Sequence, residues 1–367
     1  MALKNALVHG GNVYAAAREL RRPIGSLLDF SASINPLGPS PQVIRALATA
    51  APLIQHYPDP DCVSVKQSIA RRWKISPDRL VIGNGSSELI DVIPRALGIR
   101  SALIVGPTYG EYARAVARAG GRYQMVLARR NDEYRPPLER VTHRVQVQRS
   151  GRRAIDAVFI CHPNSPTGRP GDLQQLDDLF QAAERGRIWV VLDESFIDYC
   201  DALTCVPRLQ AYPRLIILRS FTKFYGMPGL RIGYSLSSRS VAAILKDRQP
   251  PWSVNTVAQR AAEAAIADRR HARRCLAYVG RERARMTKQL AALAGVTVIP
   301  SSTNFLFAEL PPSCGAGLMT AALRRRGMLI RDCSSVEGCG LGSIRIAVRT
   351  KGENDRLLAA LAQVLEG

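Results

Sequence analysis

From about residue 79 to residue 237, short apolar runs rich in β-branched residues alternate with stretches that have helical periodicity. The apolar runs predict strands at 79–82, 102–105, 123–127, 157–161, 188–192, 215–218 and 232–236. The stretches between them predict helices at 86–97, 111–119 and 172–185. Runs that are apolar throughout, such as 188–192, are typical of strands covered on both faces. Strands separated by helices favour a doubly wound α/β core with a mostly parallel sheet.

The pattern changes after residue 246. Two consecutive prolines, Pro250 and Pro251, interrupt the chain, and a long alanine-rich helical stretch begins near Asn255. Beyond it the pattern predicts strands at 305–309, 328–331 and 343–348, and helices at 318–326 and 354–365. We therefore expect three parts: an N-terminal loop segment at 1–35 that packs over the active site, a large domain at 36–248, and a smaller α+β domain at 249–367.

Composition limits the class of protein. No apolar run approaches the ~20 residues of a membrane span, and the first residues are too short and too polar for a signal peptide. The eight cysteines form no Cys-x-x-Cys pair, which disfavours zinc sites and disulfide frameworks. We expect a cytoplasmic protein that binds neither a metal nor a membrane.

The formal net charge is +21, a balance that can indicate nucleic-acid binding. However, the arginines are spread along the whole chain. Their densest run, at 129–153, is polar and lacks interleaved aromatic residues. We expect this run to be a solvated loop or hairpin and expect no nucleic-acid partner. A positive field would instead attract anionic substrates.

One lysine stands in an unusual position. Only seven of the 51 basic residues are lysines, and Lys223 follows the strand predicted at 215–218. It lies beside the hydroxyls of Ser220 and Thr222 and precedes a glycine-containing turn that ends at Arg231. A lysine amine forms a Schiff base with an aldehyde cofactor. The position of Lys223 therefore predicts an anchor for pyridoxal 5'-phosphate.

Other polar signals follow predicted strands, at the sheet edge where ligands bind in open α/β folds. Ser86 and Ser87 open a helix after two glycines, which predicts a phosphate site, although a simple helix cap has the same pattern. Asn164 lies in a proline-rich turn, where its amide could bind a ring hydroxyl or merely support the turn.

Asp193 directly follows an apolar strand, and a carboxylate there needs a partner. A protonated pyridine nitrogen would provide one and would keep the ring cationic, while a helix cap is the alternative. Tyr109 also stands at a strand end, where it would stack on a cofactor ring or pack in the core.

The order of these signals resembles the fold-type I pyridoxal-phosphate enzymes of the aspartate aminotransferase superfamily over nearly the whole chain. The resemblance implies that Lys223 binds the cofactor aldehyde, Asp193 the pyridine nitrogen and Asn164 the ring oxygen. It implies that Tyr109 stacks on the ring and that Arg345 binds the substrate carboxylate. The cofactor phosphate would be held by Ser86, Ser87, Ser220, Arg231 and, from the neighbouring subunit of a homodimer, Tyr57.

Two branches of that superfamily fit best: threonine-phosphate decarboxylase of cobalamin biosynthesis and histidinol-phosphate aminotransferase. The N-terminal residues resemble the decarboxylase, and they would fold over a small phosphate ester: His9, Gly10, Gly11, Asn12, Ser33 and Asn35. Phe196 replaces a tyrosine found in many of the aminotransferases, and the run around Arg331 also resembles the decarboxylase. Arg331 is then a candidate ligand for the substrate phosphate, and a surface ion pair with Asp332 or a neighbour is the alternative.

The resemblance implies decarboxylation of L-threonine O-3-phosphate to (R)-1-amino-2-propanol O-2-phosphate, which supplies the aminopropanol linker of cobalamin. An aminotransferase of the histidinol-phosphate type is the alternative, because the same residues serve both reactions. A cofactor-sensing regulator is a third hypothesis, but it needs a DNA-binding module that the sequence does not show.

Overall fold

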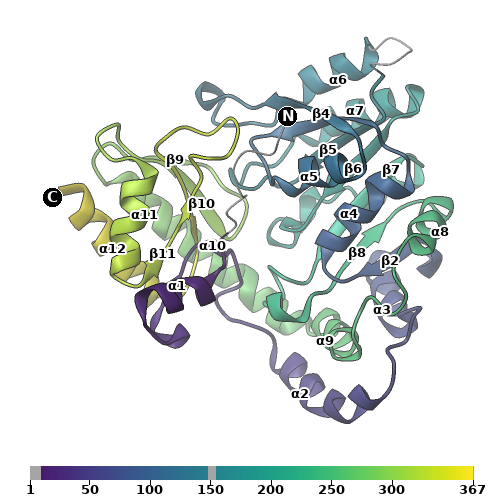
Figure 1. The fold of residues 1–367 in the computed structure, drawn as a ribbon, viewed down its shortest axis with the longest axis horizontal. Helices are drawn as coiled ribbons and strands as arrows, with labels where there is room; N and C mark the ends of the chain where they lie inside the picture. The colour runs from purple at the N-terminus through teal and green to yellow at the C-terminus, as the bar shows by residue number, and fades with distance from the viewer. Residues whose placement is uncertain (1–9, 148–153, 367) are drawn as a thin grey trace.

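The computed structural model describes residues 10–147 and 154–366. Its larger domain is built on a seven-stranded sheet in the order β2-β8-β7-β6-β5-β3-β4, in which β8 alone runs antiparallel to its neighbours (Figure 1). The strands are β2 (Leu80–Gly83), β3 (Ser101–Gly106), β4 (Arg122–Leu127), β5 (Ala157–Cys161), β6 (Trp189–Asp193), β7 (Leu215–Ser220) and β8 (Gly233–Leu236).

Helices cover both faces of this sheet, as the apolar runs predict. Alternate residues of β5 enter two separate cores: Val158 and Ile160 pack with α3, α6, α7 and α9, whereas Phe159 packs with α4, α5 and α8. The helices of this domain are α2 (Pro41–Ala50), α3 (Val63–Trp73), α4 (Ser86–Ala96), α5 (Glu111–Arg118), α6 (Leu138–Gln146), α7 (Leu173–Arg185), α8 (Arg239–Asp247) and α9 (Thr256–Ala267).

The smaller domain contains an antiparallel sheet in the order β12-β13-β10-β9, with helices packed on it (Figure 1). The long helix α10 leads into this domain from α9. The elements are α10 (Arg269–Ala291), β9 (Thr297–Ile299), β10 (Phe305–Glu309), α11 (Ala316–Arg325), β11 (Met328–Leu329), β12 (Arg331–Asp332), β13 (Ser343–Ala347) and α12 (Lys351–Glu366). The expected α/β architecture with a smaller α+β domain is confirmed.

The N-terminal segment joins this smaller domain. Its strand β1 (Leu28–Asp29) pairs in parallel with β11. The segment also forms a helix, α1 (Val13–Leu20), whose Ala16 packs with Leu27 and Leu329. The expectation of a loop segment at 1–35 is therefore wrong for α1, whose inward residues Val13, Ala16, Ala17 and Leu20 recur at helical spacing. The three-part division of the chain stays a prediction.

The arginine-rich run at 129–153 also differs from expectation. Leu138, Val141 and Val145 recur at helical spacing and are buried, so the run contains helix α6 and is not a loop or hairpin throughout. Its residues 148–153 lie outside the described part of the chain. The strand expected at 328–331 is divided into β11 and β12, which pair with different partners, β1 and β13. No helix within residues 10–147 or 154–366 has the length and apolar content needed to cross a bilayer.

Candidate active site

A cavity of about 480 Å³ lies between the two domains, at the carboxyl ends of the parallel strands. Residues from both domains line it. The cavity brings together ten of the residues singled out in the sequence: Gly10, Ser86, Ser87, Tyr109, Asp193, Ser220, Lys223, Arg231, Arg331 and Arg345.

One end of the cavity has the features of an anion site. Ser86 and Ser87 open helix α4, where backbone N–H groups have no partner within the helix. Gly85 precedes them at φ +75°, and a Cβ atom there would overlap the Arg231 guanidinium. That guanidinium donates to Ser87 Oγ at 3.1 Å. Glycine at this position therefore lets a helix N-terminus and an arginine face the same point.

Asp193 lies at the end of β6 and is buried. Tyr112 donates its hydroxyl to Asp193 Oδ2 at 2.7 Å, and Ser195 donates both its backbone N–H (2.9 Å) and its hydroxyl (2.5 Å) to Oδ1. Burial raises the pKa of Asp193, while these hydrogen bonds and Lys223 oppose that rise. The carboxylate is thus held in a fixed orientation beside the cavity.

The supporting groups Tyr112 and Ser195 were not among the residues predicted from the sequence. Tyr112 lies in the first turn of α5, Tyr109 lies just before that helix, and their rings meet edge to face at 5.7 Å. Ser195 lies two residues after Asp193, the spacing of an Asx turn. Both local signals were present in the sequence, but neither identifies Asp193 as the group supported.

Lys223 lies in the turn that follows β7, and its amine lines the cavity. Burial and the positive charges of Arg345 and Arg231 lower the pKa of Lys223 to about 8, against the opposing effect of Asp193. The Lys223 Nζ atom lies 5.7 Å from the centre of the Phe196 ring. A substantial fraction of this amine is therefore neutral, and nucleophilic, slightly above neutral pH.

Asn164 is buried beside the cavity wall, next to the lining residue Ser165. Its Nδ2 atom donates to the Pro107 carbonyl at 2.8 Å and to Thr167 Oγ1 at 2.9 Å. These bonds fix the amide in the turn. Its contact with a ring oxygen stays a prediction.

The opposite side of the cavity presents two arginines. Arg345 and Arg331 are register partners on the antiparallel strands β13 and β12. Arg345 donates to Ser165 Oγ at 2.9 Å and to the Ser31 carbonyl at 2.7 Å, so it connects the large domain to the N-terminal segment. Burial lowers the pKa of Arg345, and the charge of Arg331 adds to this effect. Two cations held this close favour an anionic ligand between or beside them.

Of the N-terminal residues predicted to contact the substrate, some line the cavity and others do not. Gly10 lines the cavity, and a Cβ atom on it would overlap the Ser31 carbonyl. Gly11 donates its N–H to Ser31 Oγ at 2.8 Å, and Asn12 caps helix α1. His9 lies outside the described residues.

Two further predicted ligands are buried away from the cavity lining. The Asn35 amide donates to the Phe224 carbonyl at 2.7 Å and to Cys275 Sγ at 2.9 Å, and its backbone N–H donates to the Lys223 carbonyl at 3.0 Å. Ser33 is buried, and within residues 10–147 and 154–366 its hydroxyl has no hydrogen-bond partner. Asn35 therefore supports the lysine turn, while substrate contacts by Ser33 and Asn35 stay predictions.

Tyr57 does not line the cavity of this single chain. Its side chain is 80% exposed, and its ring lies 4.9 Å from that of Trp252 on the surface of the large domain.

The remaining groups fit a flat, anionic aldehyde cofactor. The cavity offers an amine for the aldehyde, a helix N-terminus with an arginine for a phosphate, and a buried carboxylate for a basic ring nitrogen. Thr108, which also lines the cavity, has a buried hydroxyl without a hydrogen-bond partner in the described chain. A polar ligand would satisfy such a group.

Comparison with known proteins agrees with this arrangement. The family model described as aminotransferase class I and II matches residues 26–361. A threonine-phosphate decarboxylase of Salmonella typhimurium is 36% identical and covers 100% of this chain and 99% of the relative. A histidinol-phosphate aminotransferase of Anaeromyxobacter sp. is 32% identical, over 93% of this chain and 92% of the relative.

A solved structure extends the similarity. The histidinol-phosphate aminotransferase from Sinorhizobium meliloti, in complex with pyridoxal-5'-phosphate, has a TM-score of 0.86 and 27% identity to this chain. The match covers 98% of this chain and 96% of that structure.

Proposed function

The chain belongs to the class I and II aminotransferase family, and on this premise we propose that it decarboxylates L-threonine O-3-phosphate. Its cofactor is pyridoxal 5'-phosphate. The proposed product is (R)-1-amino-2-propanol O-2-phosphate, which would supply the aminopropanol linker of cobalamin.

The observation that carries the proposal is the pairing of Arg345 with Arg331 at one side of the cavity. L-Threonine O-3-phosphate has two anionic groups, a carboxylate and a phosphate, separated by a short carbon chain. Two adjacent guanidinium groups suit such a ligand, since each can hold one anion with paired hydrogen bonds. Histidinol phosphate has a phosphate but no carboxylate, so it would use only one of the two, whereas its co-substrate 2-oxoglutarate has two carboxylates and could use both.

In the proposed reaction, each of these residues would have a separate role. When bound, the cofactor supplies an electron sink for the bond broken at the substrate α-carbon. Arg345 holds the carboxylate that leaves as CO2, and Arg331 holds the phosphate. The Lys223 amine, with a pKa of about 8, would give a proton to the α-carbon that loses CO2. Three hydrogen bonds to Asp193 favour its ionised form, which would pair with a protonated ring nitrogen of the bound cofactor.

Phe196 provides further support for the proposed decarboxylase function. It lies beside the Lys223 amine and contacts Phe305 edge to face at 5.1 Å. A phenylalanine offers no hydroxyl to a ring oxygen, so that oxygen would depend on Asn164 instead. The aminotransferase reaction remains the second candidate because a relative with that name is 32% identical to this chain.

We also propose that the enzyme is a homodimer in which Tyr57 of each chain reaches the cofactor phosphate of the other. Exposure supports this proposal, because Tyr57, Ile54 and Trp252 together present large apolar surface to solvent. Light scattering would measure the mass in solution. A monomer that retained full activity would contradict the proposal.

The test of the function is a direct comparison of two substrates. The cofactor-loaded protein is incubated with L-threonine O-3-phosphate while CO2 is measured, and separately with histidinol phosphate and 2-oxoglutarate while glutamate is measured. We expect CO2 from the first mixture and little glutamate from the second. Arg331→Gln serves as the specificity control and should weaken the advantage of phosphorylated over free L-threonine. Glutamate formation without CO2 would contradict the proposal.

A further inference from the structure

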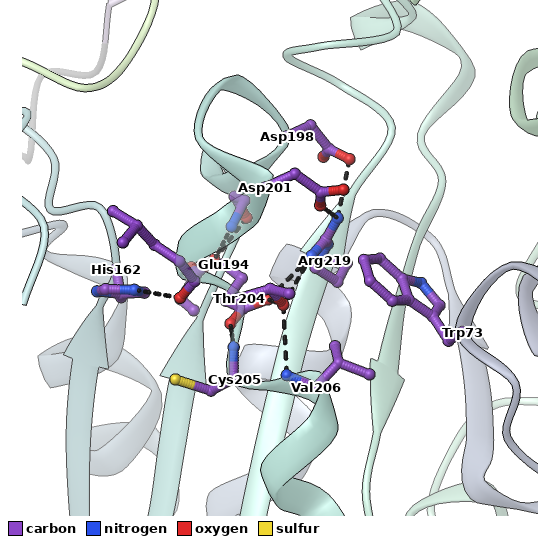
Figure 2. Close-up of polar contacts among 12 residues, drawn as sticks. Trp73, His162, Glu194, Asp198, Asp201, Thr204, Cys205, Val206 and Arg219 are labelled. Carbon is purple, nitrogen blue, oxygen red and sulfur yellow. Dashed lines mark hydrogen bonds and ion pairs between the residues drawn. The ribbon is translucent and has the colours of Figure 1, made fainter. Parts of the chain in front are cut away.

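A cluster of buried charges lies behind the cavity wall. Its centre is Arg219, whose side chain is 1% exposed. The guanidinium donates from Nη1 to Glu194 Oε2 at 2.9 Å and from Nη2 to Asp198 Oδ1 at 2.8 Å (Figure 2). Glu194 and Asp198 are buried as well. One planar guanidinium therefore bridges two carboxylates, which a lysine ammonium at this position would not do with the same geometry.

The rest of the cluster fixes this bridge. Glu194 also accepts hydrogen bonds from the Cys205 backbone N–H at 2.6 Å and from Thr204 Oγ1 at 2.7 Å. The Arg219 guanidinium lies 4.7 Å from the centre of the Trp73 ring, at the end of α3 (Figure 2). A buried ion pair often adds little to the free energy of unfolding, because well-packed apolar residues in its place can stabilise a protein equally well. Stability alone therefore does not explain the cluster, and we consider instead whether it positions the neighbouring cavity residues.

Two members of the cluster are chain neighbours of cavity residues. Glu194 directly follows Asp193 at the end of β6, and Arg219 directly precedes Ser220 at the end of β7. Side chains alternate across a strand, so one residue of each pair faces the cavity and the other faces the cluster. The Glu194–Arg219 bond thus ties together, from behind, the two strand ends that present Asp193 and Ser220.

The third member acts on the lysine. Asp198 lies in the short 3-10 helix η5 (Ile197–Tyr199). Phe196 immediately precedes this helix and lies beside the Lys223 amine. Tyr199 ends it and donates its hydroxyl to the Lys223 carbonyl at 3.4 Å. Anchoring Asp198 therefore fixes two groups that contact the lysine, one at its amine and one at its backbone.

We propose that Arg219 is a positioning residue. Through its bridge between Glu194 and Asp198, it holds Asp193, Ser220 and Lys223 in the positions needed to bind the cofactor and to react. Arg219 does not line the cavity. The inference rests on Lys223 being the lysine that binds the cofactor. It does not depend on whether decarboxylation or transamination follows, so its test can fail independently of the proposed function.

The test uses Asp198→Asn, which removes one charge from the bridge and keeps its size. Asp177→Asn is the control, because Asp177 accepts two hydrogen bonds from Arg208 at 2.7 and 2.8 Å and neither residue lines the cavity. Arg219→Lys is the second test variant. It keeps the charge but cannot bridge both carboxylates in the same way, and Asp198→Asn still decides the question if this variant does not fold.

Two measurements separate positioning from a purely structural role. The first is the rate at which apo-protein takes up pyridoxal phosphate as a function of pH, which reports the neutral fraction of Lys223. The charges that act most strongly on that amine are Arg345, Arg231, Asp193 and Asp29. The second is the division of any kinetic loss between kcat and KM.

We expect Asp198→Asn to move the uptake midpoint upward by about half a pH unit or more, because a loosened turn admits water to the lysine. We also expect kcat to fall ~10- to 100-fold with little change in KM, as a misplaced reacting group would cause. Asp177→Asn should change neither. The inference is overturned if Asp198→Asn loses stability but keeps the wild-type midpoint and kcat.

Discussion

Gly85→Ala tests the anion site most sharply, because it combines two penalties that can be separated. Gly85 adopts φ +75° and ψ 161°, a backbone conformation that costs a residue with a Cβ atom about 1–3 kcal/mol. The new Cβ would also overlap the Arg231 guanidinium and displace it from Ser87. Loss of one charge-assisted hydrogen bond to the cofactor phosphate costs about 1.5–3 kcal/mol. The dissociation constant for pyridoxal phosphate should therefore rise ~10- to 150-fold.

Gly98→Ala is the matched control. Gly98 lies just beyond the other end of α4 at φ +63°, and a Cβ atom there would meet nothing within 4 Å. This variant should lose ~1–2 kcal/mol of unfolding free energy and bind the cofactor normally. Urea denaturation of the apo-proteins measures the first quantity, and absorbance titration with pyridoxal phosphate measures the second. If Gly85→Ala bound the cofactor as tightly as Gly98→Ala, Arg231 and the start of α4 would not form the phosphate site.

Three further outcomes are expected. Tyr112→Phe removes one of three hydrogen bonds to Asp193 and should lower kcat ~10-fold or more at unchanged cofactor content, measured by steady-state kinetics and absorbance. Lys223→Ala should bind pyridoxal phosphate without forming a Schiff base, so the yellow absorbance and the activity should both be absent. Because burial lowers the pKa of Lys223 to about 8 in the folded apo-protein, the unfolded chain binds more protons between pH 8 and 10.5. The difference in unfolding free energy between the wild type and Lys223→Met should then rise with pH across this range, by up to ~3 kcal/mol in paired urea titrations.

The sequence predicts the sheet well because its strands are buried on both faces. An apolar run such as Val158 to Ile160 has no amphipathic alternative, and the strand is found at Ala157–Cys161 as its pattern predicts. Helices α1 and α6 were missed although their inward residues recur at helical spacing. Around α6, the arginine-rich composition led to the expectation of a solvated loop.

For the candidate site too, some residues could be predicted from the sequence and others could not. Residues with a distinctive local pattern, such as Lys223 after its strand and Ser86 at a helix start, line the cavity, and their roles there stay predictions. Groups whose role depends on distant contacts were not found. Tyr112 and Arg219 each contact partners that only the fold brings near, and the support that Asn35 gives to the lysine turn was not foreseen either.

The most direct test of the proposed function is the number of turnovers without any 2-oxo acid. A decarboxylase regenerates its cofactor in each cycle, whereas an aminotransferase leaves the amino group on the cofactor and stops after one turnover. The measurement counts CO2 released per active site from L-threonine O-3-phosphate, with the cofactor absorbance followed in the same sample. We predict many molecules of CO2 per site and an unchanged final spectrum. A single turnover without CO2 that leaves the cofactor as the amine would contradict the proposed function.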